Sequence, residues 1–158
     1  MNKTNIGWFT HTWNPVTGCK RGCTYCYARA LHEKRRTALL NGAKLPEYYR
    51  KPFEEIQYHM DRLVDKDLKS KKPRTVFVGS MSDIAYWHPD CTCAILSICK
   101  EHPQHTFMFL SKSQEAYDGF DWPENTMQGL TLTSVRTEET TYALVKMLEC
   151  RRPYLSIE

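Results

Sequence analysis

Three cysteines, Cys19, Cys23 and Cys26, lie within eight residues of one another in the segment WNPVTGCKRGCTYCYARAL, which runs from Trp13 to Leu31. Thiolates are soft ligands, and a loop this short can wrap them around one inorganic cluster. A four-iron cluster normally takes four cysteine ligands, so three would leave one iron with an open coordination position. An open position distinguishes a catalytic metal site from a closed structural one. The spacing therefore favours an iron-sulfur cluster that accepts a further ligand.

Zinc is the alternative occupant of the same three thiols. His11, eight residues before Cys19, would complete a tetrahedral Cys3His site. The chain would then be a zinc-stabilised module that binds nucleic acid or a protein partner without catalysis. A disulfide framework is disfavoured, because the chain has seven cysteines and no secretion signal. The other four are expected to be a loop pair and buried helix residues, because free cysteine packs as a small hydrophobic residue; they are Cys91, Cys93, Cys99 and Cys150.

The bulk properties of the chain limit the remaining classes. At 158 residues it is long enough for one domain with a core and short for two, so we expect a single domain over residues 1–158. No apolar run reaches the ~18 residues of a membrane span, and the N-terminal segment lacks the apolar core of a signal peptide, which predicts a cytoplasmic protein and no membrane partner. The net charge is +4, with basic stretches at 33–36, 49–51 and 66–74. Nucleic acid is therefore a candidate substrate, although solvated surfaces explain the same charges.

Alternating apolar runs predict helices and strands in turn. Apolar residues at helical spacing predict helices over 27–40, 52–69 and 91–102 and a further one from Thr137, and His59 is expected on a solvated helix face. Short β-branched and aromatic runs predict strands over 10–16, 74–80, 105–112, 128–134 and 153–158. Strands that alternate with helices are typical of βα units. The expected fold class is therefore α/β, with about five parallel strands and outer helices.

Polar residues follow each predicted strand, where the site of a parallel sheet normally forms. The cysteine loop follows the first strand, and Ser82 and Asp83 follow the second. Ser111 and Lys112 follow the third, and Ser134 follows the fourth. Loops are polar in most proteins, so one such group would mean little. Because all of them meet at one edge of a parallel sheet, we expect them to form one site with the thiols.

The motif C-x3-C-x2-C with an aromatic residue, Tyr25, before its last cysteine resembles the signature of the radical S-adenosylmethionine superfamily. The whole chain resembles, more closely, the phage and bacterial three-cysteine-motif radical SAM-like family, through the segments WNPVTGCKRGCTYCYAR, FVGSMSD, PQHTFMFLSK and YLSIE. This resemblance implies a [4Fe–4S] cluster held by Cys19, Cys23 and Cys26. It also implies that S-adenosylmethionine binds the open iron and that a flavodoxin or ferredoxin supplies an electron. Cleavage of the cofactor would then give a 5'-deoxyadenosyl radical, which abstracts hydrogen from a substrate.

A more distant resemblance to spore photoproduct lyase suggests which residues contact the cofactor. It implies contacts from Tyr27, Ser82, Lys112 and Ser134, beside Tyr25, and either Ser82 or Asp83 would hold the cofactor's amino group. This sequence departs from that lyase at Ser80, where the lyase has a hydrogen-donating cysteine, and it has GSMSD where the superfamily has Gly-Gly-Glu. Thymine-dimer repair is therefore not expected.

The superfamily resemblance also implies a partial (β/α) barrel of six strands. The sequence ends on Glu158, within its fifth predicted strand. We therefore expect a barrel that lacks its sixth strand, as a fragment, as a short variant or as a protein completed by a partner chain.

Overall fold

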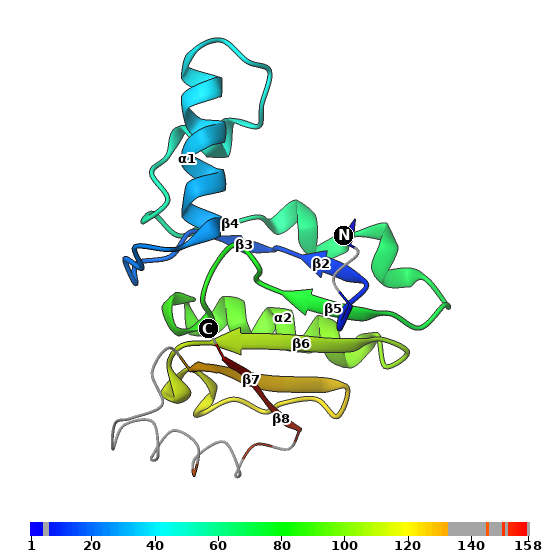
Figure 1. Cartoon of the computed structure of the whole chain (residues 1–158). Coiled ribbons are helices and arrows are strands. Elements are labelled where there is room, and N and C mark those ends of the chain that lie inside the picture. The colour runs from blue at the N-terminus through cyan, green and yellow to red at the C-terminus, as the bar shows by residue number, and fades with distance from the viewer. Residues whose placement is uncertain (5–6, 133–144, 146–149, 151, 158) are drawn as a thin grey trace.

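A computed structural model describes residues 1–4, 7–132, 145, 150 and 152–157 of the chain (Figure 1). Its main sheet has six strands in the order β1-β2-β5-β6-β7-β8. Five of them run parallel, and β1 pairs antiparallel with β2 at one edge. The strands of this sheet are β1 (Asn2–Lys3), β2 (His11–Trp13), β5 (Thr75–Val78), β6 (Thr106–Ser111), β7 (Thr126–Leu132) and β8 (Pro153–Ile157). The fold is mixed α/β, as the sequence predicts.

One face of the sheet packs on α2 (Pro89–Glu101), which lies behind the strands in Figure 1. The helix starts at Pro89, a residue suited to a first turn, and buries Ile95, Leu96 and Cys99. Alternate residues of the strands form the other half of this core, because successive side chains of a strand point to opposite faces. These strand residues are Trp13, Val76, Val78, Phe107 and Phe109.

The first helix, α1 (Tyr27–Leu40), has the bounds that the sequence predicts. Cys26 is its N-cap, and Gly42, with a φ of 91°, follows its C-cap. Its buried side chains, which include His32 and Leu39, face the 3-10 helix η1 (Glu47–Arg50). In Figure 1 the helix projects from the sheet on the side of β2 and of a two-stranded ribbon formed by β3 (Val16–Thr17) and β4 (Gln57–Tyr58).

The helix predicted over 52–69 is wrong. The segment holds β4 and two 3-10 helices, η2 (Met60–Val64) and η3 (Lys66–Lys69). Contacts with distant residues override the helical spacing: the Trp13 indole donates to the Arg62 carbonyl at 2.8 Å, and Arg62 donates to the Asn14 carbonyl at 2.8 Å. His59 is half-buried and hydrogen-bonded to Thr17 Oγ1, so the prediction of a solvated histidine is also wrong.

The other predicted elements differ from the structure mainly at their ends. The first predicted strand, 10–16, is divided between β2 and β3, which belong to different sheets. The fourth predicted strand begins two residues earlier than expected, at Thr126, and its last two residues lie outside the described part of the chain. The helix expected from Thr137 falls among residues that the structure does not describe. Short 3-10 helices follow β5 and β6, namely η4 (Ile84–Tyr86) and η5 (Gln114–Tyr117).

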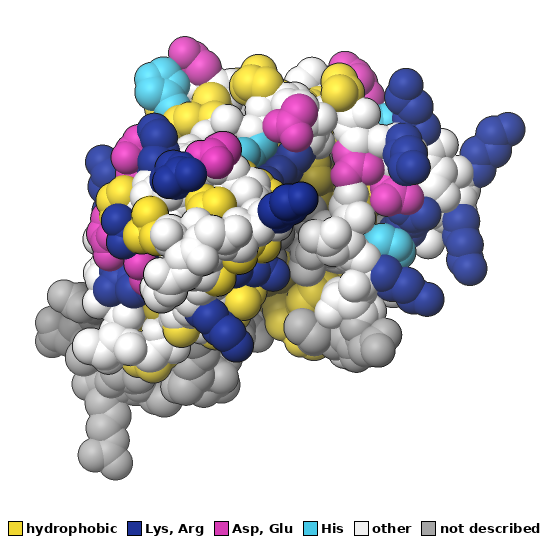
Figure 2. Space-filling model, turned by 90° about the horizontal axis from the view of Figure 1, so that it is seen from above, with side chains coloured by type: hydrophobic (Ala, Val, Ile, Leu, Met, Phe, Trp, Pro, Cys, Tyr) yellow, Lys and Arg dark blue, Asp and Glu magenta, His cyan; other side chains and the backbone are white. Residues whose placement is uncertain are grey.

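Lysines gather at the amino end of β5. The segment before this strand carries exposed Lys66, Lys69, Lys71 and Lys72. Figure 2 shows Lys and Arg side chains along the edge of the molecule on which this segment lies. This basic stretch therefore lies at the amino end of β5, away from the carboxyl end of the strand. In the described part of the chain, no helix is long and apolar enough to cross a bilayer.

Candidate functional site

A pocket of about 470 Å³ opens at the carboxyl ends of β5 and β6, beside the loop with three cysteines. Its volume is in the usual range for small-molecule sites. The residues that sequence analysis singled out border it from three parts of the chain: Cys19, Cys23, Tyr25, Cys26, Tyr27, Ser82, Asp83 and Lys112. Ser134, the remaining predicted member, lies outside the described residues.

The start of the cysteine loop is held by backbone contacts. Gly18 donates from its N–H to the Met81 carbonyl at 2.9 Å, and Cys19 donates to the Phe53 carbonyl at 2.9 Å. Gly18 has a φ of 97°, and a Cβ there would lie 2.5 Å from the Glu55 carbonyl oxygen. Only glycine satisfies both the left-handed backbone and this close approach. The loop therefore leaves the ribbon in a direction that brings its thiols to the pocket.

The three cysteines are free thiols, each partly exposed. The Cys26 sulfur accepts from the Arg29 N–H at 3.4 Å in the first turn of α1, a position where the helix dipole favours negative charge. Burial raises the pKa of Cys19. In the described part of the chain, no three His, Cys, Asp or Glu side chains converge on one point closely enough to hold a metal ion. As donors, three soft thiols fit an iron-sulfur cluster, whose ligands bind different irons.

Asp83 connects the three segments around the pocket. It is 7% exposed and accepts hydrogen bonds from Ser111 Oγ at 2.6 Å, from the Lys112 N–H at 3.2 Å and from the Ala85 N–H at 3.1 Å. The guanidinium of Arg21, in the cysteine loop, lies 3.6 Å from its Oδ2. Buried carboxylates are stable only with such partners. Asp83 therefore positions the loops, and both of its oxygens are engaged within the protein.

Ser82 is engaged in a similar way. Its hydroxyl donates to the Val16 carbonyl at 3.2 Å and accepts from the Trp87 indole at 3.1 Å. The serine thus connects the end of β5 to the ribbon strand that precedes the cysteines.

Two tyrosines and a lysine form the mouth of the pocket. Tyr25 is 61% exposed, and the Lys112 ammonium lies 3.0 Å from its hydroxyl and 4.8 Å from the centre of its ring. The Tyr27 hydroxyl donates to the Ser80 carbonyl, which joins the start of α1 to the loop after β5. A lysine at such a mouth suits the carboxylate of a bound molecule.

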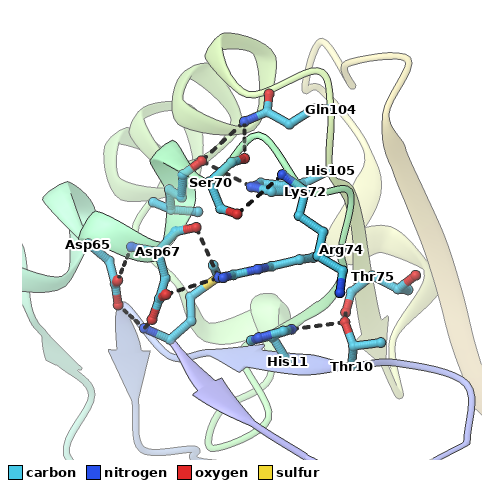
Figure 3. Close-up of polar contacts among 12 residues, drawn as sticks. Thr10, His11, Asp65, Asp67, Ser70, Lys72, Arg74, Thr75, Gln104 and His105 are labelled. Carbon is cyan, nitrogen blue, oxygen red and sulfur yellow. Dashed lines mark hydrogen bonds and ion pairs between the residues drawn. The ribbon is translucent and has the colours of Figure 1, made fainter.

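His11 lies at the other end of the sheet and cannot serve as a fourth zinc ligand. Its Nδ1 is 2.9 Å from Thr10 Oγ1, and Thr10 Oγ1 bonds the Thr75 carbonyl at the start of β5. Figure 3 shows His11 in a polar cluster with Arg74 and Asp67, whose side chains meet at 3.1 Å. The three thiols border a pocket at the carboxyl ends of the same strands. The prediction that His11 completes a Cys3His zinc site is therefore wrong.

One wall of the pocket is not among the residues predicted from the sequence. Trp8, Phe9 and Phe77 line it, with ring centroids 4.9 Å apart for the first two and 5.1 Å for Phe9 and Phe77. Thr131 of β7 and Ser156 of β8, which are register partners, also line it. The alternation of side chains along these strands was the available signal. It could not show which face would remain open, because this depends on where α2 packs.

The cysteines outside the loop border no part of this pocket. Cys99 is fully buried in α2, as expected of a helix residue, and this burial raises the pKa of its thiol. The prediction of a loop pair at Cys91 and Cys93 is wrong, because both lie in α2 and Cys93 is exposed. These residues provide matched controls for the thiols of the loop.

Comparison with known proteins assigns the chain to a family. Residues 3–158 match the family described as "Protein of unknown function (DUF5131)". Because the match spans nearly the whole sequence, the chain belongs to this family. No curated protein and no solved structure matches the chain.

Proposed function

We propose that this protein is a radical S-adenosylmethionine enzyme that holds a [4Fe–4S] cluster through Cys19, Cys23 and Cys26. The observation that carries the proposal is that these three thiols border one pocket with polar residues from the ends of β5 and β6. The resemblance of the cysteine motif and of the later segments to radical SAM proteins supports the same function. We also propose that the parallel sheet is part of the partial (β/α) barrel typical of these enzymes.

With a flavodoxin or ferredoxin as electron donor, the bound cluster would supply the electron that cleaves the C5'–S bond of S-adenosylmethionine. The products would be methionine and a 5'-deoxyadenosyl radical, which would take a hydrogen atom from the substrate. The protein's own residues bind and orient. Lys112 attracts the carboxylate of the methionine part, and Tyr25 and Tyr27 flank it at the mouth. Ser82 and Asp83 hold the surrounding loops, and Ser134 stays a predicted contact.

The aromatic wall gives the pocket an apolar side opposite these polar groups. Trp8, Phe9 and Phe77 would exclude water from bound cofactor or substrate. The exposed lysines at 66–72 precede β5 and do not line this pocket, which opens at the carboxyl end of the strand. The basic stretch therefore gives no direct support to nucleic acid as the substrate.

Anaerobic reconstitution with iron and sulfide tests the cluster. We expect brown protein with absorbance near 400 nm, and release of 5'-deoxyadenosine when dithionite and S-adenosylmethionine are added. A triple Cys→Ala variant at positions 19, 23 and 26 should lose both signals. A variant with Cys91→Ala and Cys93→Ala should keep them, because these α2 cysteines lie outside the pocket lining.

Metal analysis of the aerobically purified chain distinguishes the enzyme from a binding module. One stoichiometric zinc without iron, together with salt-sensitive binding to nucleic acid, would contradict our proposal and indicate a zinc-stabilised binding module. Wild-type protein that forms no cluster would equally overturn it.

A further inference from the structure

A second pocket has a volume of about 310 Å³. It is bordered by α1, η1, η2, the edge strand β1 and its neighbour β2, and it shares no lining residue with the first pocket. Two arginines face it from different elements, Arg35 from α1 and Arg62 from η2. The pocket is thus separate from the site described above and has its own charge.

Each of these arginines lies beside a tyrosine ring. The guanidinium of Arg35 lies 5.4 Å from the ring centre of Tyr49 and donates to its hydroxyl. The guanidinium of Arg62 lies 4.9 Å from the ring centre of Tyr48 and donates to the Asn14 carbonyl. A guanidinium has five N–H donors, so the one hydrogen bond that each group makes here leaves further donors for a bound anion.

The positive charge of the two arginines is not neutralised by nearby acids. Among the residues that the structure describes, no carboxylate lies within ion-pair distance of Arg35 or Arg62. Asp65 is the carboxylate in the lining, and the amino group of Met1 pairs with it. Two guanidiniums around a small cavity favour an anion with several oxygens, as in Arg recognition of phosphate.

His32 supplies a second and independent observation. It is 0% exposed and lines the pocket, and its Nε2 lies 2.9 Å from the Lys51 carbonyl. A carbonyl only accepts, so Nε2 carries the hydrogen, and Nδ1 is an acceptor in the neutral ring. This Nδ1 is buried and has no hydrogen-bond partner in the structure. Buried polar atoms are nearly always satisfied, so an O–H donor is expected in the cavity.

We propose that this pocket binds a phosphate monoester. Its oxygens accept from Arg35 and Arg62, and its monoanion, whose second pKa is about 6, retains an O–H that donates to His32 Nδ1. At pH 5.5 a carboxylate or a sulfate has no such hydrogen, whereas most of the phosphate ester retains it. The cavity is larger than one phosphate group, which favours a small organic phosphate over the free ion.

Isothermal titration calorimetry of the full chain at pH 5.5, below the second pKa of about 6 so that the monoanion predominates, tests this site without reconstituted cluster. Adenosine monophosphate and inorganic phosphate are the two probes, and sulfate is the comparison. We expect both phosphates to bind more tightly than sulfate. Tighter binding of the nucleotide assigns the site to an organic ester, and equal binding assigns it to free phosphate.

Variants identify the pocket. Arg35→Gln and Arg62→Gln should each weaken phosphate binding about tenfold or more. Lys34→Gln removes the same charge from an exposed neighbour on α1 and should leave affinity unchanged. His32→Gln should abolish the preference for phosphate over sulfate, and circular dichroism of each variant checks its folding.

Three results would overturn the proposal. They are no binding of either phosphate at about 10 mM, equal affinity for sulfate, and equal losses in Lys34→Gln and the two pocket variants. Because the titration needs no cluster, none of these outcomes bears on the proposed radical chemistry.

Discussion

Asp83 shows how a predicted ligand can take a different role in the folded protein. Its carboxylate binds the end of β6 through Ser111 and Lys112, its own loop through Ala85 and the cysteine loop through Arg21. A carboxylate that satisfies so many internal donors is a positioning residue. The loops around the first pocket therefore depend on one buried charge.

Substitution of Asp83 by Asn should destabilise the fold by about 1–3 kcal/mol, because an amide accepts at one position only and its NH2 must face either the Ser111 or the Lys112 donor. Urea unfolding of the two proteins measures this difference. Asp118→Asn, at an exposed carboxylate, should change the free energy of unfolding by less than about 0.5 kcal/mol. Equal effects of both variants would contradict the positioning role.

His59 gives the fold a dependence on pH. Burial, aided by the charge of Arg62, lowers the pKa of His59 to about 4. In the unfolded chain a histidine titrates near about 6.5, so between these values the unfolded state binds more protons. Stability is therefore unaffected by this group above about pH 6.5 and falls as the pH drops toward 4.

Thermal and urea unfolding of wild type and His59→Gln at about pH 7 and pH 4.5 test this dependence. Glutamine keeps a polar partner for Thr17 and does not titrate. Wild type should lose about 1–2 kcal/mol more than the variant over this interval, after allowance for solvent screening. Parallel pH profiles for the two proteins would show that His59 is not the titrating group.

At the scale of elements, the junction between the β3–β4 ribbon and the cysteine loop determines where the thiols lie. Gly18 is at this junction, hydrogen-bonded to Met81 and enclosed by the carbonyls of Phe53 and Glu55. Gly22, later in the same loop, has a φ of 78° and no atom within 4 Å of the position where a Cβ would be. The two glycines thus share a backbone conformation and differ in their surroundings.

Gly18→Ala should destabilise the protein more than Gly22→Ala by about 1–3 kcal/mol. Both variants place an alanine at a positive φ, but only in Gly18→Ala does the new Cβ also clash with neighbouring backbone carbonyls. Chemical denaturation gives both free energies. Gly18→Ala should in addition reduce the iron bound after reconstitution. Equal destabilisation by both substitutions would mean that the backbone around Gly18 accommodates a Cβ without any additional loss of stability.

At the scale of the whole molecule, β8 packs a large ring over a glycine of the neighbouring strand β7. Tyr154 of β8 lies across Gly129 of β7, and its hydroxyl donates to the Phe109 carbonyl of β6 at 2.7 Å. A Cβ on Gly129 would lie 2.2 Å from this ring. One aromatic residue therefore connects three neighbouring strands, and burial raises the pKa of its hydroxyl.

A double-mutant cycle tests this contact. Gly129→Ala should cost about 2–4 kcal/mol in wild type, because the tyrosine ring must move, and about 1 kcal/mol or less in a Tyr154→Ala background. The free energy of unfolding of the four proteins gives the coupling. Additive effects would show that β8 docks without this packing.

Local features of the sequence determined the helix over 27–40, the core strands and the spacing of three thiols. Each of these depends on neighbouring residues, as a helical period, a β-branched run or a short loop. The polar residues that follow β5 and β6 at the first pocket were also predictable, because parallel strands bring their carboxyl ends to one edge.

Tertiary structure alone decided the rest. The segment 52–69 has helical spacing, but its hydrogen bonds go to Trp13, Asn14 and Pro15, far away in the sequence. The internal bonds of Asp83 and the second pocket also join segments that are distant in the chain. Spacing records only which residues are near one another along the chain, whereas these contacts depend on which surfaces meet when the sheet and its helices pack.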